Sequence, residues 1–394
     1  MEAVTDVVFR HVVKQAGAPD VFFTEFANAT GWVHAGDKAI AGRLIKTDDE
    51  HPLVAQIWGG EPGDMEQFAA HCAKLGFDGI DINMGCPAKS AIKSGGAALI
   101  RRPDVAVAAI AAAKTAGLPV SVKTRLGYTY IDEWREWLST LLTQNLANLT
   151  IHLRTKKEMS KVPAHYELID DIIKLRDEIA PQTLLTINGD IRNRAHGEEL
   201  ARQHPGVNGI MIGRGVFSDP FCFRASRAVS QKKSGLALAG PGLFYDDTRE
   251  MGNKYAKLET VEHSRGADVS AERSRSISSG DTSEKSTPAQ ERGAGDADFA
   301  DDVREASEAI RKEHSEGAEL SITTRKTELI ALLHYHLDLF DRYQPTLGRP
   351  FETLKRFFKI YIRDFDGAKE LREKLMHTKN TSEVRQILEE IQYL

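Results

Sequence analysis

The stretch Gly79-Ile80-Asp81-Ile82-Asn83 is typical of a buried strand, and Met84-Gly85-Cys86-Pro87-Ala88-Lys89 continues it into a tight loop. A strand that ends in polar residues and leads directly into such a loop is typical of the carboxyl end of a strand in a parallel barrel. The same pattern recurs along the first 230 residues, so this stretch indicates the fold of the whole region.

Six further strands are predicted in this region, at residues 20–24, 53–58, 120–124, 149–152, 184–188 and 209–213. Helical segments are predicted beside them, at about 5–16, 62–76, 103–116, 131–145, 165–178 and 193–203. Strands that alternate with helices of this length indicate parallel βαβ units. Several of the strands are apolar on both faces, as buried parallel strands are.

Two observations favour a closed barrel over an open doubly wound sheet. Polar residues cluster at the carboxyl ends of the strands, where barrel enzymes carry their chemistry. The helix at about 5–16 has no strand before it. A strand ending just before Met1 would raise the number of predicted strands from seven to the eight of a closed barrel. We therefore predict an α/β protein with a (β/α)8 TIM barrel whose first strand is missing from the sequence, since a barrel short of one strand exposes two edges.

Composition divides the chain into residues 1–230, 231–320 and 321–394. Residues 263–319 contain 14 acidic and 8 basic residues, a net charge of −6, which leaves the rest of the chain at +1 because the total is −5. This segment has almost no aromatic residues, and we predict a disordered acidic insert at about 263–305 within the linker 231–320. The near-neutral remainder does not exclude an RNA partner.

Residues 321–394 show helical periodicity alone and predict a small helical bundle. A second helix is expected at 351–362 and a third at 381–392. The first helix of the bundle has an apolar face, and the second has a basic face opposite its apolar one. The apolar face comprises Leu329, Leu332, Leu333, His336, Leu337 and Phe340, and the basic face comprises Lys355, Arg356, Lys359 and Arg363.

No apolar run approaches the roughly 20 residues that cross a bilayer, and the start of the chain has no signal-peptide pattern. We therefore expect a cytoplasmic protein without a membrane partner, and a monomer. The three cysteines include no close pair, which argues against a disulfide framework or a metal site. Cys72 in an amphipathic helix and Cys222 in an apolar run are expected in the core.

Cys86 has two interpretations. A lone cysteine is commonly a buried, inert thiol. Its place between Gly85 and Pro87, at the carboxyl end of a strand, favours a functional role instead. Lys123 ends the strand at 120–124, and His152 with Arg154 follows the next strand, so these groups are expected on the same rim as the thiol.

Two glycine-containing loops follow the last two strands. They are Asn188-Gly189-Asp190 and Gly213-Arg214-Gly215. Glycines there let backbone N–H groups approach a phosphate, and the loops after the seventh and eighth strands are the usual barrel phosphate site. Ordinary strand–helix turns would explain either loop alone.

Together these segments resemble the tRNA-dihydrouridine synthases. The resemblance covers residues 1 to about 225, and more loosely 329–392. The matching segments are Met1 to Arg10, Thr24-Glu25, Val54 to Ile57, Asn83 to Lys89, Val122 to Arg125, His152 with Arg154-Thr155, Asn188 to Asp190 and Gly213 to Gly215.

The resemblance implies FMN, NADPH as reductant and a uridine of tRNA as substrate. Hydride would pass from flavin N5 to C6 of the uracil, and Cys86 would protonate C5, which suits a thiol whose normal pKa is roughly 8.5. The implied cofactor contacts are Met1, Gln56, Lys123, His152, Asn188, Gly189, Asp190, Gly213 and Arg214. The expected substrate contacts are Asn83, Lys89, Arg125, Arg154, Lys355 and Arg356.

Two alternatives remain at this point. One is an FMN barrel that reduces a free small pyrimidine, and the other is a tRNA-binding protein that has lost its cofactor. The sequence leaves open which tRNA position is reduced, NADPH against NADH, and the role of the acidic insert.

Overall fold

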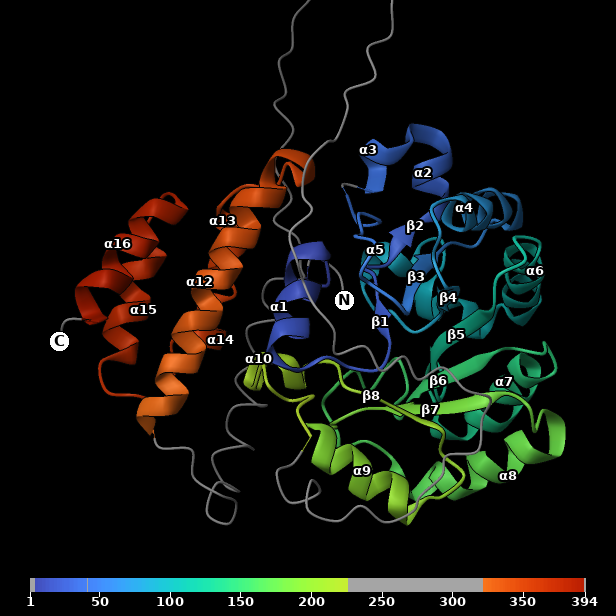
Figure 1. Cartoon of the computed structure of the whole chain (residues 1–394). Helices are drawn as coiled ribbons and strands as arrows, with labels where there is room; N and C mark the ends of the chain where they lie inside the picture. The colour runs from blue at the N-terminus through green and yellow to red at the C-terminus, as the bar shows by residue number, and fades with distance from the viewer. Residues whose placement is uncertain (1–3, 41, 226–321, 393–394) are drawn as a thin grey trace, which may run out of the picture. The chain divides into compact units, whose positions relative to one another are not determined.

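The computed structural model describes residues 4–40, 42–225 and 322–392 (Figure 1). Met1, implied above as a cofactor contact, and the predicted linker and acidic insert within 231–320 lie outside these residues. No helix in the described part of the chain is long and apolar enough to span a bilayer.

A parallel sheet forms the centre of the α/β region. Its strands lie side by side in chain order, with β1 and β8 at the two ends. The strands are β1 (Phe22–Phe23), β3 (Leu53–Trp58), β4 (Gly79–Asn83), β5 (Val120–Arg125), β6 (Asn148–His152), β7 (Leu184–Asn188) and β8 (Gly209–Met211), while β2 (Ala27–Asn28) pairs with the far end of β3. This confirms the predicted barrel-type parallel fold, and β3, β4 and β7 have the predicted bounds.

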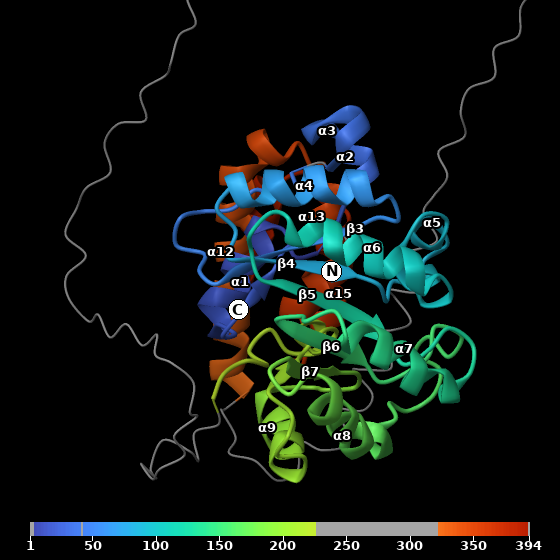
Figure 2. The same ribbon diagram turned by 90° about the vertical axis from the view of Figure 1, so that its right-hand side faces the viewer.

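Helices pack on one face of this sheet (Figure 2). They are α4 (Pro62–Lys74), α6 (Pro103–Lys114), α7 (Trp134–Leu142), α8 (Ile169–Ile179) and α9 (Arg194–Gln203). Prolines begin α4 and α6, where the missing N–H costs nothing. The α2 (Ala29–Ala35) and α3 (Asp37–Ile40) helices were not predicted.

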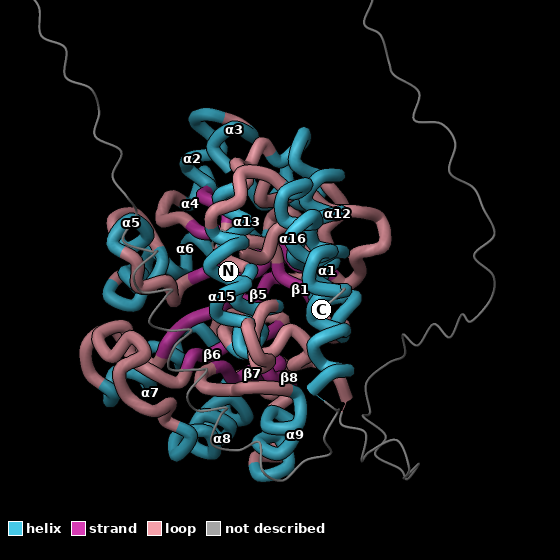
Figure 3. The backbone as a smooth tube through the Cα atoms, turned by 90° about the vertical axis from the view of Figure 1, so that its left-hand side faces the viewer, coloured by secondary structure: helices cyan, strands magenta, loops and turns pink. Residues whose placement is uncertain are grey.

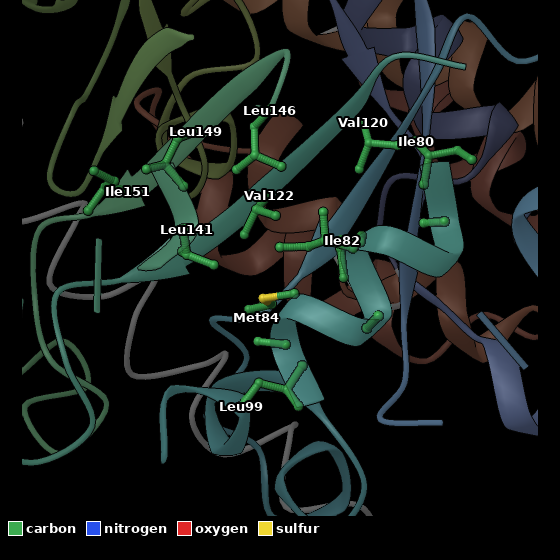
Figure 4. Close-up of a cluster of buried hydrophobic side chains, with 14 of the residues drawn as sticks. Ile80, Ile82, Met84, Leu99, Val120, Val122, Leu141, Leu146, Leu149 and Ile151 are labelled. Atoms are coloured by element: carbon green, nitrogen blue, oxygen red, sulfur yellow. The ribbon is translucent and has the colours of Figure 1, made fainter. Parts of the chain in front are cut away.

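Alternate residues of each strand face the helices. Apolar side chains of β4, β5 and β6 lie together beside Leu141 of α7 in Figure 4. Because side chains in a strand point to opposite faces in turn, the intervening residues face the other side of the sheet. Those residues are mostly polar, and they include most of the predicted site.

The C-terminal segment is helical, as predicted. It contains α12 (Ile322–Leu347), α13 (Glu352–Lys355), α14 (Phe358–Tyr361), α15 (Ala368–Met376) and α16 (Thr381–Gln392), shown with the other helices in Figure 3. The single helix predicted at 351–362 was wrong, since Arg356 and Phe357 form a turn between α13 and α14. This turn lets Phe357 join the core beside Phe9, at 4.9 Å between ring centroids.

One apolar core joins the C-terminal helices to α1 (Val7–Gly17). In this region Arg10 is 1% exposed and pairs with Glu50, with 2.5 Å between Nε and Oε1. Its remaining donors reach the carbonyls of Thr5 and Ile45, both at 2.8 Å. His336, expected on the apolar face of α12, is buried, and its Nδ1 lies 2.7 Å from the hydroxyl of Tyr361.

Candidate active site

The strand register places polar side chains in rows across the sheet. Asn83 pairs with Lys123, and Lys123 pairs with Thr150. Two residues further along the strands, Arg125 lies beside His152, and His152 beside Asn188. These rows lie at the carboxyl ends of the strands, an edge of the sheet called the mouth below, so the register brings together residues predicted from four separate segments.

A chain of hydrogen bonds leads from the sheet to the Cys86 loop. The buried carboxylate of Asp81 accepts from Ser121 Oγ at 2.7 Å and from Gln56 Nε2 at 2.8 Å. The amide oxygen of Gln56 accepts from Asn83 Nδ2 at 3.2 Å. Asn83 Oδ1 then accepts from the backbone N–H groups of Gly85 and Cys86, at 3.1 and 3.0 Å. The side chains of β3 and β4 therefore fix the backbone that carries the thiol.

Glycines allow the Cys86 loop to pack closely. The Cys86 carbonyl accepts from Ala97 N at 3.0 Å, and Gly96 has a φ of 56°. A Cβ on Gly96 would lie 2.9 Å from the Cys86 oxygen. Cys86 is half-buried, whereas Cys72 and Cys222 are buried in the core as predicted, and burial raises the pKa of the Cys72 thiol to about 12. Cys86 is therefore the one partly exposed thiol of the three.

Basic groups converge on the mouth. Burial and the neighbouring Arg125 together lower the pKa of Lys123 to about 8, against the opposing effect of Asp81 and Cys86. The pKa of His152 lies well below its usual value because of burial and the same cations, together with Arg154 and Arg214. His152 is therefore neutral at pH 7 within a cluster of positive charge.

The cluster has more donors than acceptors. Nδ1 of His152 and Nη1 of Arg154 are buried, and within the described residues neither has a hydrogen-bond partner. Burying a charged donor without an acceptor is costly. Lys123, Arg125, His152, Arg154 and Arg214 thus form a site whose chemistry fits an anionic ligand such as a phosphate or a reduced flavin.

Asp190 holds two of these arginines. Its carboxylate forms an ion pair with Arg154, accepts from Ala164 N at 2.9 Å, and lies 3.8 Å from Arg214. The carboxylate of Asp190 is therefore engaged by the two arginines and the Ala164 N–H. Gly213 is open, since a Cβ there would meet only Asn188 Nδ2, at 3.8 Å.

The chain matches a family model described as dihydrouridine synthase (Dus) over residues 1–261. The chain belongs to the dihydrouridine synthase family. A probable tRNA-dihydrouridine synthase 2 of Bacillus subtilis (strain 168) is 45% identical over 394 residues, which cover 100% of this chain and 92% of the relative. A probable tRNA-dihydrouridine synthase of Staphylococcus aureus (strain Mu50) is 42% identical over 394 residues, covering 100% and 91%. Another, of Staphylococcus epidermidis (strain RP62A), is 42% identical over 391 residues, covering 99% and 91%.

The residues expected to contact substrate differ from one another in their exposure and in the contacts that they already make. Lys89 is exposed at the start of the short helix α5 (Lys89–Ile92). Arg125 and Arg154 are buried, at 8% and 2% exposed. Lys355 donates to the carbonyl of Met376 at 2.9 Å and pairs with Glu352 at 3.0 Å, so its ammonium group is already engaged. Arg356 lies in the turn that follows α13.

Sequence reasoning missed Asp81 and Ser121 as supports of the site. Asp81 is completely buried, and burial raises its pKa, opposed by hydrogen bonds from Ser121 and Gln56. The available signal was a carboxylate in the middle of an otherwise apolar strand, which requires a partner on a neighbouring strand. The helix that follows β8, α10 (Gly215–Ser218), has four residues and adds little dipole.

Proposed function

We propose that this chain reduces uridine in tRNA to 5,6-dihydrouridine, with FMN as its cofactor and NADPH as the reductant. Family membership and the names of the relatives support this reaction. The observation that carries the proposal is the half-buried thiol of Cys86 on a hydrogen-bonded loop beside the basic cluster of the mouth. A tRNA substrate would place the reaction in the cytoplasm.

The residues at the mouth fit FMN because they include more hydrogen-bond donors than acceptors. An anionic cofactor would supply the missing acceptors. Lys123 and His152 would lie against the ring, with Gln56 beside them. Asn188, Gly189, Gly213 and Arg214 would hold the phosphate, and Asp190 would orient Arg214 and Arg154. Bound there, FMN would supply hydride chemistry, taking a hydride from NADPH and passing one to C6 of the uracil. The cations of the mouth would stabilise the negative charge of a reduced flavin ring that lies against them.

Cys86 would deliver the proton that completes the reduction. Its S–H bond breaks as a C–H bond forms at C5, and the resulting thiolate is reprotonated from solvent. Lys123 and Arg125 lie close enough to Cys86 to be influenced by its charge, so they would stabilise this thiolate. The hydrogen bonds from Asn83 to the loop hold the thiol in one position, which a general acid requires.

The substrate must leave its stack to reach the thiol. A uridine in folded RNA is stacked, and enzymes that act on a base extrude it while holding the flanking phosphates. Lys89 is exposed one short loop beyond Cys86, which makes it a candidate for such a phosphate contact, and Arg356 is a second candidate.

Replacing Cys86 with alanine tests the acid role. Cys86→Ala should lower dihydrouridine formation by about 10²- to 10⁴-fold, the usual contribution of a general acid, while flavin reduction by NADPH stays unchanged. Cys72→Ala removes a buried thiol of α4 and serves as the control. Normal product yield from Cys86→Ala would exclude the role.

The reaction itself is tested with the complete protein on two substrates. We expect dihydrouridine to form in tRNA, detected by mass spectrometry of nucleosides, and no turnover of free uracil. Equal or faster reduction of free uracil would support a small-molecule reductase instead. Sequencing dihydrouridine in tRNA from cells without the gene then identifies the position reduced.

A further inference from the structure

Tyrosines and lysines gather on the loops that follow β5 and β6, and Arg101 lies beside them. Nζ of Lys156 lies 5.0 Å from the ring centroid of Tyr128, and Cζ of Arg101 lies 5.1 Å from the same centroid. Nζ of Lys157 lies 5.6 Å from the centroid of Tyr130. These five residues are called the tyrosine platform below. Tyr130 is 66% exposed, the most exposed large hydrophobic side chain in the described part of the chain.

Backbone hydrogen bonds hold the platform rigid. Lys156 N donates to the Gly127 carbonyl at 2.8 Å, and Lys157 N donates to the Tyr128 carbonyl at 2.9 Å. The carboxylate of Glu133 accepts from the backbone N–H groups of Tyr128 and Tyr130, at 2.6 and 2.9 Å. The exposed ring is therefore presented by an ordered loop, so little conformational entropy is lost when a partner binds.

The platform adjoins the Cys86 loop on two sides. Arg125 Nε donates to the Gly85 carbonyl at 2.8 Å, and its Nη1 donates to the Thr155 carbonyl at 3.1 Å, next to Lys156. On the other side, η1 (Gly96–Arg101) begins with the bond from Ala97 N to the Cys86 carbonyl and ends at Arg101. The platform and the thiol thus share one buried arginine and one short helix.

We propose that the tyrosine platform binds the unstacked nucleotides of tRNA that flank the uridine at Cys86. Proteins that hold single-stranded nucleic acid combine aromatic rings, on which bases stack, with cations that contact phosphates. Tyr130 supplies the accessible ring, and Lys156, Lys157 and Arg101 supply the cations. The carboxylate of Glu133 is engaged by the backbone N–H groups of this loop. This inference rests on the proposed function and adds the part of the surface that receives the RNA.

Binding of unmodified tRNA transcript, measured by fluorescence anisotropy without turnover, tests the platform. Tyr130→Ala should weaken binding about 5- to 100-fold, the range of base–aromatic stacking, while Tyr130→Phe should bind within about twofold of wild type. Lys157→Gln should reduce the slope of log affinity against log salt by roughly 0.7, as expected for one lost contact to single-stranded phosphate. KM for tRNA should rise with the dissociation constant, with kcat little changed.

Two matched variants lie away from the mouth. Lys174→Gln removes an exposed lysine of α8, and Leu184→Ala removes a side chain that is 52% exposed at the amino end of β7. Both should bind tRNA as wild type does. Unchanged circular dichroism of Tyr130→Ala shows that the loop change leaves the fold intact.

Wild-type affinity in both Tyr130→Ala and Lys157→Gln would overturn the inference. The inference would also be overturned if these two variants lost as much affinity for polyglutamate as for tRNA. The platform would then be a general anion surface rather than an RNA site. Because binding is measured separately from turnover, wild-type protein that binds tRNA through the platform but makes no dihydrouridine would overturn the proposed function alone.

Discussion

Two buried arginines illustrate the difference between the α1 region and the mouth. Arg10 donates twice to Glu50 and once each to two carbonyls, so its donors are matched by acceptors. Arg154 is equally buried, but within the described residues its Nη1 has no acceptor. Both carry a charge that is costly to bury. The comparison supports the proposal that an arginine whose nitrogens all have acceptors stabilises the fold, whereas Arg154 with its unused donor would bind a ligand.

The largest effect on stability is expected from breaking the buried ion pair between Arg10 and Glu50. Arg10→Met leaves the carboxylate of Glu50 buried without its guanidinium, which should cost about 3–5 kcal/mol of stability. Denaturant unfolding measures this loss. The double variant Arg10→Met/Glu50→Leu removes both charges and should recover much of it. A single variant as stable as wild type would contradict the structural role of Arg10.

A smaller loss of stability, together with a loss of ligand, is expected at the mouth. Arg154→Met leaves Asp190 with the N–H of Ala164 and with Arg214, so the fold should tolerate the change better than Arg10→Met. We propose that the unused donor of Arg154, which the sequence assigned to a substrate contact, binds FMN instead, so FMN affinity should fall about 10- to 100-fold, the range for losing a charged hydrogen bond of about 2 kcal/mol. Titration of apoprotein with FMN, followed by flavin fluorescence, measures it.

Arg176 provides the control for Arg154, because it is buried and bonded to Asn208 and to the carbonyls of Thr183 and Gly206. Arg176→Met should lower stability without weakening FMN binding. Equal FMN loss in both variants would show that the effect is a general consequence of losing a buried arginine.

The smallest effect concerns pH. The pKa of Lys123 is lowered to about 8, so the lysine loses its charge as the pH rises through 8. An anionic ligand favours the charged form and raises this pKa. FMN affinity should therefore be constant below about pH 8 and fall by up to about tenfold per unit above it. Lys123→Arg keeps its charge and should flatten the profile; an unchanged slope in that variant would mean that another group is responsible.

The strands could be predicted because each combines an apolar face with a polar end. β4 and β7 have the predicted bounds, and the polar ends of four strands meet at the mouth as expected. Local patterns suffice here, since the carboxyl ends of parallel strands lie on one edge. The roles of Cys86 and the phosphate loops remain predictions.

Contacts between distant segments could not be predicted from local patterns. Arg10 and Glu50 are 40 residues apart, and no spacing rule links them. The break between α13 and α14 follows from Phe357 packing on Phe9, a contact that helical periodicity cannot reveal. The engaged ammonium of Lys355 and the positioning role of Asp190 depend likewise on neighbours elsewhere in the chain.

The alternation along each strand separates two tasks. In β4 the isoleucines at 80 and 82 pack toward the helices, while Asp81 and Asn83 support the thiol loop. Residues on the sheet face opposite the helices can therefore change during evolution while the apolar packing against the helices is kept. One scaffold can in this way come to accept a different ligand. Insertion of a single residue into such a strand would have the opposite consequence, because it would exchange the two faces and abolish both tasks at once.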